Sequence, residues 1–307
     1  MRISSSTIYD ASVNAMQQQS AKLLQAQQQI ATGRRILTPA DDPIGAAQAL
    51  QVTQSQTMNA QYSTNAGSAS DSLTLEESVL GNITSLLQDV RDIAVTAGNG
   101  AFSSTERAIL ATDLSGRYQQ MLGLANTVDG NGQYLFSGYK GGVRPFTERV
   151  PGTMGTVDYN GDQGQRLIQI SPSEQLAVSD AGGDVFQHIP AAGGGYQDVF
   201  KTIDDLVKLL QKTPFDQAGL APSQTNIDNA LDNVSAVRAS AGSRLKQLEA
   251  VQNAGEDRAL QYSQTLSRLQ DADYAKAAAE LMQQQVSLQA AQQSYVKVAG
   301  LSLFNYL

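Results

Sequence analysis

Large apolar residues recur every seven positions at both ends of the chain. In the C-terminal part the row consists of Tyr274, Leu281, Leu288 and Tyr295, and a second row three positions later ends with Val298. In the N-terminal part the row consists of Tyr9, Met16, Leu23 and Ile30. A period of seven with a companion row at an offset of three places these positions on one face of an α-helix. Each end of the chain is therefore expected to form a long helix with a heptad stripe.

The two stripes are thin. Their companion rows contain Gln19 and Gln284, whose amides cannot be buried without hydrogen-bond partners. Because fixing the backbone costs free energy at every residue, we expect the terminal helices to become ordered against other subunits. The expected assembly interface is the set of striped residues, namely Tyr9, Met16, Leu23, Ile30, Tyr274, Leu281, Leu288, Tyr295 and Val298. An ordinary antiparallel helix pair packed within its own domain is the alternative.

The helical period also fills most of the chain between its two ends. The expected helices cover about residues 5–32, 44–63, 73–97, 104–128, 198–213 and 224–269, and the pattern allows the last one to continue into the terminal helix. Gly33 is expected to end the first helix, since glycine is favoured just after a helix. The segment from Asn65 to Gly67 is expected to separate the second helix from the third. In the third helix, Glu76 is the only residue out of pattern.

The composition changes between about residues 133 and 196. Glycine and proline become frequent, and short alternating runs at 156–159, 166–170 and 175–178 predict strands, with Asn160-Gly161 as a hairpin turn between two of them. The expected fold is mainly α with a small inserted β domain, an α+β arrangement. Long antiparallel helices from both termini form its bundle or coiled-coil core, and the β insert lies at the tip. The expected domains are 1–44 with 272–307, 45–134 with 198–271, and 135–197.

Two adjacent carboxylates, Asp41 and Asp42, follow the first predicted helix. Asp42 is a suitable N-cap, and Pro43 suits the first position of the helix that follows. Paired carboxylates can also perform acid–base chemistry or bind a cation. Capping together with a local ion pair to Arg34 or Arg35 is the interpretation that we favour.

The charge balance bears on possible partners. The chain has 21 basic and 29 acidic residues, a net charge of −8 and no block of lysine or arginine. This composition disfavours binding to nucleic acid or to an anionic membrane. No apolar run approaches the length of a membrane span, and residues 1–10 lack the apolar region of a cleaved signal peptide. If the protein leaves the cell, we expect a route that does not use such a peptide.

Few residues suit catalysis or metal binding. The chain has no cysteine and a single histidine, His188, which we expect at the surface. Walker A, Gly-x-Ser-x-Gly and Gly-x-Gly-x-x-Gly sequences are absent. The segment 159–164 has too few carboxylates for a calcium loop and is better explained as a tight turn. We therefore expect a protein without cofactor, metal or enzymatic activity; an enzyme site in the β insert, at His188 and Asp162, is the competing hypothesis.

Three segments resemble bacterial flagellins. They are Ile-Ala-Thr-Gly-Arg-Arg-Ile at 30–36 followed by Ala-Asp-Asp at 40–42, Leu-Gln-Asp-Val-Arg-Asp-Ile-Ala-Val at 87–95 followed by Gly-Asn-Gly at 98–100, and Asp-Ala-Asp-Tyr-Ala at 271–275. The resemblance implies that Arg34, Asp41 and Asp42 lie in the connection between the terminal and middle layers of the subunit. It also implies that Arg91 takes part in packing of the middle layer.

Other features resemble the members of this family that lie between the hook and the filament of the flagellum. They are the early Tyr9, the sequence Gly-Gln-Tyr-Leu-Phe-Ser-Gly at 132–138 before a compact insert, and the ending Leu-Ser-Leu-Phe-Asn-Tyr-Leu at 301–307. This resemblance implies a ring of copies that joins the first hook-associated protein to flagellin. It further implies export by the flagellar type III apparatus, with a cytosolic export chaperone holding the C-terminal helix. A filament-forming flagellin is the alternative.

Overall fold

The computed structural model describes residues 5–99 and 102–300. Within them the chain forms two compact units. The terminal unit contains the residues up to 59 and from 257 onward, and the large unit contains residues 60–256. Two long helices, α2 (Pro43–Ala97) and α6 (Leu220–Gln270), each contribute to both units. The three-domain division expected from the sequence stays a prediction.

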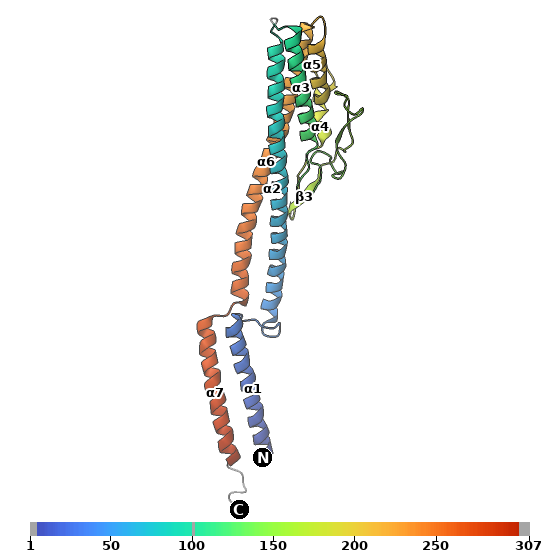
Figure 1. Cartoon of the computed structure of the whole chain (residues 1–307). Coiled ribbons are helices and arrows are strands. Elements are labelled where there is room, and N and C mark those ends of the chain that lie inside the picture. Colours follow the sequence, from blue (N-terminus) through green and yellow to red (C-terminus); the bar gives the residue numbers. More distant parts are fainter. Residues whose placement is uncertain (1–4, 100–101, 301–307) are drawn as a thin grey trace, which may run out of the picture. The chain divides into compact units, whose positions relative to one another are not determined.

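The terminal unit is built on α1 (Ser5–Thr32) and α7 (Tyr274–Gly300), which pack side by side (Figure 1). The pair is antiparallel, because Tyr9 contacts Tyr295 at one end and Arg34 forms a backbone bridge with Asp271 at the other. The first helix ends at Thr32 as predicted, and Gly33 follows with φ +69°. α6 ends at Gln270, so it does not continue into α7.

The large unit contains α3 (Ser104–Ala125) and α5 (Val199–Gln211), packed against each other beside α2 and α6 (Figure 1). The predicted heptad face of α2 packs in the core of this unit, where Leu80, Ile83 and Val90 are fully buried. A cluster of aromatic rings completes this core. It consists of Tyr118, Phe136, Phe146, Phe186 and Phe200.

The strands form three separate antiparallel pairs. They are β1 (Phe146–Glu148) with β2 (Val157–Tyr159), β3 (Leu167–Ser171) with β4 (Glu174–Ala177), and β5 (Ile189–Pro190) with β6 (Tyr196–Gln197). A short helix, α4 (Gly182–Phe186), lies between β4 and β5, and a 3-10 turn (Gln217–Gly219) precedes α6. Two-stranded pairs bury little surface alone. They share their core with the helices, since Phe146 of β1 packs on Phe186 of α4 and on Phe200 of α5.

Three expectations need correction. α2 is one helix of 55 residues without a break at Asn65–Gly67, because Ala66 and Ala69 are fully buried against β3 and β4, and this packing outweighs the helix cost of Gly67, about 1 kcal/mol. Asn160-Gly161 is not a hairpin turn, because β2 pairs with the preceding β1. β3 and β4 also lie along the sides of α2 and α6, where Ile170 and Leu176 pack with Leu73 and Leu248, instead of at the end of the helices.

Candidate functional site

The predicted stripes of α1 and α7 face each other within one chain. The rings of Tyr9 and Tyr295 lie 5.4 Å apart, and the side-chain amides of Gln19 and Gln284 are hydrogen-bonded. The large residues of the stripes are only half-buried or exposed: Met16, Leu23, Ile30, Leu281, Leu288 and Tyr295 are half-buried, and Tyr9 and Tyr274 are exposed. The side chain of Val298 lies outside the described residues. The contact between α1 and α7 thus leaves much of their apolar surface exposed. Other subunits or partner proteins could bury this surface.

A second apolar row lies on the outer face of α7, at positions 282, 286, 289, 293 and 296, which are separated by alternating steps of four and three. Met282, Val286 and Val296 are about two-thirds exposed, at 67%, 65% and 69%. Gln289 and Gln293 fill the same row and line a shallow groove with Val296. The row therefore repeats with the spacing of a heptad and carries no charge. The spacing of this row is present in the sequence, but the larger residues of the main stripe make it inconspicuous there.

A polar junction joins the ends of α1 and α6 to the starts of α2 and α7. The Ala272 N–H donates to the Gly33 carbonyl at 2.9 Å, and the Arg35 N–H donates to the Gln270 carbonyl at 2.6 Å. Gly33 is required here for two reasons. Its positive φ is unfavourable for other residues, and a Cβ at this position would lie 2.8 Å from the Tyr274 hydroxyl oxygen.

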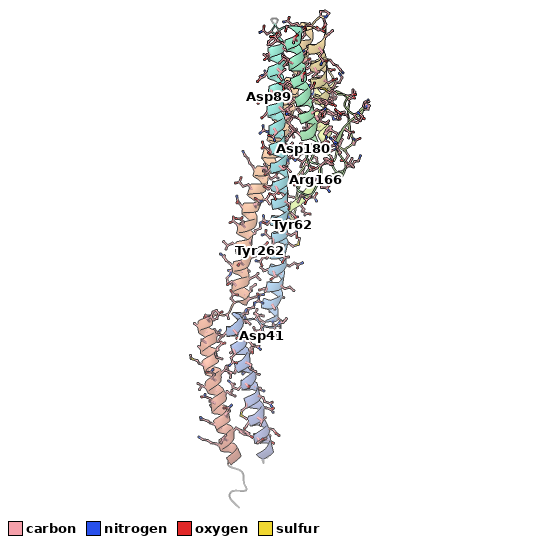
Figure 2. All side chains as sticks on the ribbon, in the orientation of Figure 1. Asp41, Tyr62, Asp89, Arg166, Asp180 and Tyr262 are labelled. Carbon is pink, nitrogen blue, oxygen red and sulfur yellow. The ribbon has the colours of Figure 1, made fainter. Side chains whose placement is uncertain are left out.

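Asp41 and Asp42 organise this junction as capping groups (Asp41 is labelled in Figure 2). Asp41 accepts hydrogen bonds from the Thr38 N–H at 2.7 Å and from the Gln25 side chain at 2.7 Å. Asp42 accepts from the Gly45 N–H at 2.9 Å in the first turn of α2. The Thr38 N–H lowers the pKa of Asp41, and the Gly45 N–H, followed by Arg35, lowers the pKa of Asp42. Both carboxylates thus stabilise backbone N–H groups, as the capping interpretation predicted.

Arg35 supplies the ion pair of the junction. Its guanidinium lies 3.0 Å from the Asp42 carboxylate and donates to the Leu269 carbonyl at 2.8 Å. Arg34, which the family resemblance had singled out, contributes its backbone to the bridge with Asp271 while the residue itself is exposed. The sequence had named both arginines as candidates for the ion pair, and only the fold distinguishes them.

Arg91 lies on α2 in the large unit. Its Nε is 2.6 Å from the carboxylate of Asp228 on α6, and both side chains are about half exposed. This pair connects two helices of one subunit. A role of Arg91 in packing between subunits stays a prediction.

Asp162 and His188, the residues considered for catalysis or metal binding, make contacts that support the local backbone. Asp162 accepts hydrogen bonds from the Tyr139 and Gly164 N–H groups, both at 2.9 Å, which is turn chemistry. His188 is exposed, with Nδ1 3.1 Å from the Gly183 carbonyl. Within residues 5–99 and 102–300, no group of three or more His, Cys, Asp or Glu side chains could hold a metal. No helix in those ranges has both the length and the apolar character of a membrane span.

Comparison with known proteins distinguishes flagellins from junction proteins. Residues 3–141 match the model of the bacterial flagellin N-terminal helical region, and residues 224–307 match that of the C-terminal helical region. Flagellin from Listeria monocytogenes is 26% identical over 43% of this chain and 46% of its own length. Flagellar hook-associated protein 3 from Salmonella typhimurium is 34% identical over 99% of both chains, and so is that from Escherichia coli K12. The chain belongs to the flagellar hook-associated protein 3 family.

Solved structures agree with this fold. The flagellar junction protein FlgL from Legionella pneumophila superposes with a TM-score of 0.63 at 21% identity, covering 73% of this chain and 100% of its own. A putative flagellar hook-associated protein from Vibrio parahaemolyticus gives a TM-score of 0.68 at 22% identity, covering 75% and 100%. The mainly helical architecture with a small β segment is thus shared with other hook-associated proteins.

In the isolated monomer, amides of this hook-associated protein should exchange at very different rates. We expect fast exchange in α1 and α7, where Ala26 and Ala277 are the only buried residues among the described side chains. We expect slow exchange in residues 73–97, whose apolar face lies in the core. Hydrogen exchange of dilute monomer measured by mass spectrometry tests this. Strong protection throughout both terminal helices would contradict it.

Replacing Arg35 with alanine should loosen the junction, whereas replacing Arg34 should not. Arg35→Ala removes both the ion pair to Asp42 and the hydrogen bond to Leu269. We expect severalfold faster amide exchange at Ala272 and Gly45 in this variant. Arg34→Ala is the matched control, since it removes the same charge and keeps the backbone bridge. Equal exchange in the two variants would show that the Arg35 side chain does not hold the junction.

Proposed function

We propose that this protein is a structural, non-enzymatic adaptor that joins the hook-associated region of the bacterial flagellum to the flagellin filament. The observation that carries the proposal is the similarity to flagellar hook-associated protein 3 over 99% of the chain. Flagellins match only part of it, 43% in the case of Listeria. A filament-forming flagellin is therefore the weaker candidate.

The assembly surface that we propose lies on the terminal helix pair. In this proposal the facing stripes, from Tyr9 with Tyr295 to Gln19 with Gln284, keep α1 against α7 in each subunit. The exposed outer row of α7, with Leu24 of α1, which is 56% exposed, contacts neighbouring copies. Neither row contains a charged residue, and Lys297 is the charged residue that lines the groove beside Val296. Burial of the exposed apolar groups favours assembly.

The other partners follow from family membership. We propose that one side of the ring contacts the first hook-associated protein and the other contacts flagellin. Export would use the flagellar type III apparatus without cleavage of a signal peptide. A cytosolic export chaperone would cover α7 before export, because an amphipathic helix with an exposed apolar row suits binding in a partner's groove and would otherwise favour aggregation.

Electron microscopy of a deletion strain tests the proposed function. We expect hooks without filaments, and flagellin released into the medium. The purified protein alone should not form long filaments. If it did, the flagellin alternative would replace the adaptor proposal. If the deletion strain kept normal filaments, neither structural role would stand, and the hypothesis of an enzyme site near His188 and Asp162 would be next.

A further inference from the structure

Glu76 is a carboxylic acid buried in the middle of α2. It is 1% exposed and lies between the fully buried Leu73 and Leu80. It is also the one residue that interrupts the heptad face of this helix. A carboxylate in such a place is costly unless charge and hydrogen bonds compensate it. Its surroundings therefore decide whether it carries a charge.

The hydrogen bonds of Glu76 are incomplete. Its Oε1 accepts from the Asp180 N–H at 2.9 Å, in the segment after β4. Its Oε2 is buried and has no hydrogen-bond partner among the described residues. One N–H group is too little to stabilise a buried carboxylate, which can accept several hydrogen bonds.

The positive charges around Glu76 belong to Arg244 and Arg166, and neither guanidinium donates a hydrogen bond to the Glu76 carboxyl in the described residues. Arg244 of α6 forms an almost buried ion pair with Asp180 and donates to the Ala177 carbonyl at 3.1 Å. Arg166, just before β3, lies 3.9 Å from Asp129 through Nη1, while its buried Nε and Nη2 have no hydrogen-bond partner among the described residues, Glu76 included. Figure 2 shows Asp180 and Arg166 beside α2.

The charges of this cluster balance only when Glu76 is neutral. Two guanidinium groups face Asp180 and Asp129, so an ionised Glu76 is a third carboxylate without a cation of its own. The neighbouring Glu77 is different, since it pairs with Arg238 at 2.5 Å and is about one-third exposed. These groups come from α2, α6, the loop after α3 and both sides of the β3–β4 pair, so the cluster joins the strands to the helices.

We propose that Glu76 is a proton-dependent latch, which holds the β3–β4 segment (residues 166–180) against α2 and α6 when protonated and loosens it when ionised. Burial, and next the negative charge of Asp180, raise the pKa of Glu76 to about 7, against the opposing effects of the Asp180 N–H, Arg244 and Arg166. When the segment opens, water restores the pKa toward its ordinary value of 4.5. The closed segment therefore binds a proton more strongly than the open one between these values. Its stability is greatest at the acid end of this range and is lost as the pH rises through about 7.

Hydrogen exchange of the full chain tests the latch. Protection factors, corrected for the intrinsic pH dependence of exchange, are compared for residues 167–178 at about pH 5.5 and about pH 8.5. We expect them to fall on the order of tenfold or more in the wild-type protein as the pH rises. In Glu76→Gln, which resembles the protonated acid, they should stay high and change less than about twofold. Glu77→Gln is the matched control and should keep the wild-type dependence.

Two results would overturn the latch: a wild-type segment with constant protection, or a Glu76→Gln protein with the same pH dependence as the wild type. If Glu76→Gln does not fold, the carboxyl carbon resonance of Glu76 in wild-type protein decides the question. A titration near neutral pH supports the latch, and an ionised carboxylate throughout this range refutes it. The latch lies within the large unit and does not depend on the proposed function, so either can fail without the other.

Discussion

Val286→Asp is expected to abolish assembly of the junction while the subunit still folds. Val286 is 65% exposed in the middle of the outer row of α7. In an assembled ring the new carboxylate would be buried among apolar groups without a partner, at a cost of several kcal/mol at every subunit contact. Because the contact repeats around the ring, this cost multiplies. We expect a strain that carries the variant to resemble the deletion strain, with hooks but few or no filaments.

Ser294→Asp provides the matched control. Ser294 is exposed on the same helix but outside the outer row, so it receives the same charge in a position that we expect to remain in water. Motility and filament number should stay close to wild type. Thermal unfolding of both purified variants should match that of the wild-type monomer, because neither residue is in the core. If Val286→Asp supported normal filaments, the outer row would not be an assembly surface.

Phe200→Ala is expected to have the largest effect on the stability of the monomer. The Phe200 ring is fully buried and lies 5.3 Å from Phe146, 5.8 Å from Phe186 and 6.1 Å from Tyr118. Replacing it removes the centre of the aromatic cluster and leaves a cavity among rings that cannot easily close it. Large-to-small changes of this kind cost about 3–5 kcal/mol. Urea unfolding followed by circular dichroism should show this loss as a lower midpoint.

Tyr196→Ala is the comparison for this prediction. Tyr196 is 74% exposed, so its removal should change the free energy of unfolding by less than about 0.5 kcal/mol. A loss below about 1 kcal/mol in Phe200→Ala would mean that the strands and α5 do not share a core. The two variants together measure how strongly the β segment is joined to the helices.

Most helices and the family could be predicted from the sequence. A seven-residue repeat is a local property, and the bounds of α1 and the start of α2 at Pro43 follow from residues within a few positions of them. The flagellin signatures are local as well. The single histidine and the absence of cysteine already argued against most metal and nucleophile chemistry.

Strand pairing and the length of α2 depended on distant contacts. β2 pairs with β1 because Phe146 and Tyr159 can then pack their rings 5.1 Å apart within the core, which no local turn signal reveals. Likewise α2 passes through Gly67 without a break because residues about 100 positions later, such as Ile170, cover its buried alanines. Long-range packing contributes more free energy than the local preference that it overrides.

The amino-acid sequence by itself determined which faces of the helices are apolar, where the first helix begins and ends, and to which family the chain belongs. Only the tertiary structure decided which partner each polar group finds. In the folded chain Arg35 forms an ion pair with Asp42, and Glu76 lies among Asp180, Arg244 and Arg166. The reason is physical: helix periodicity depends on neighbours along the chain, whereas the electrostatic environment of a buried charge depends on atoms that only folding brings together.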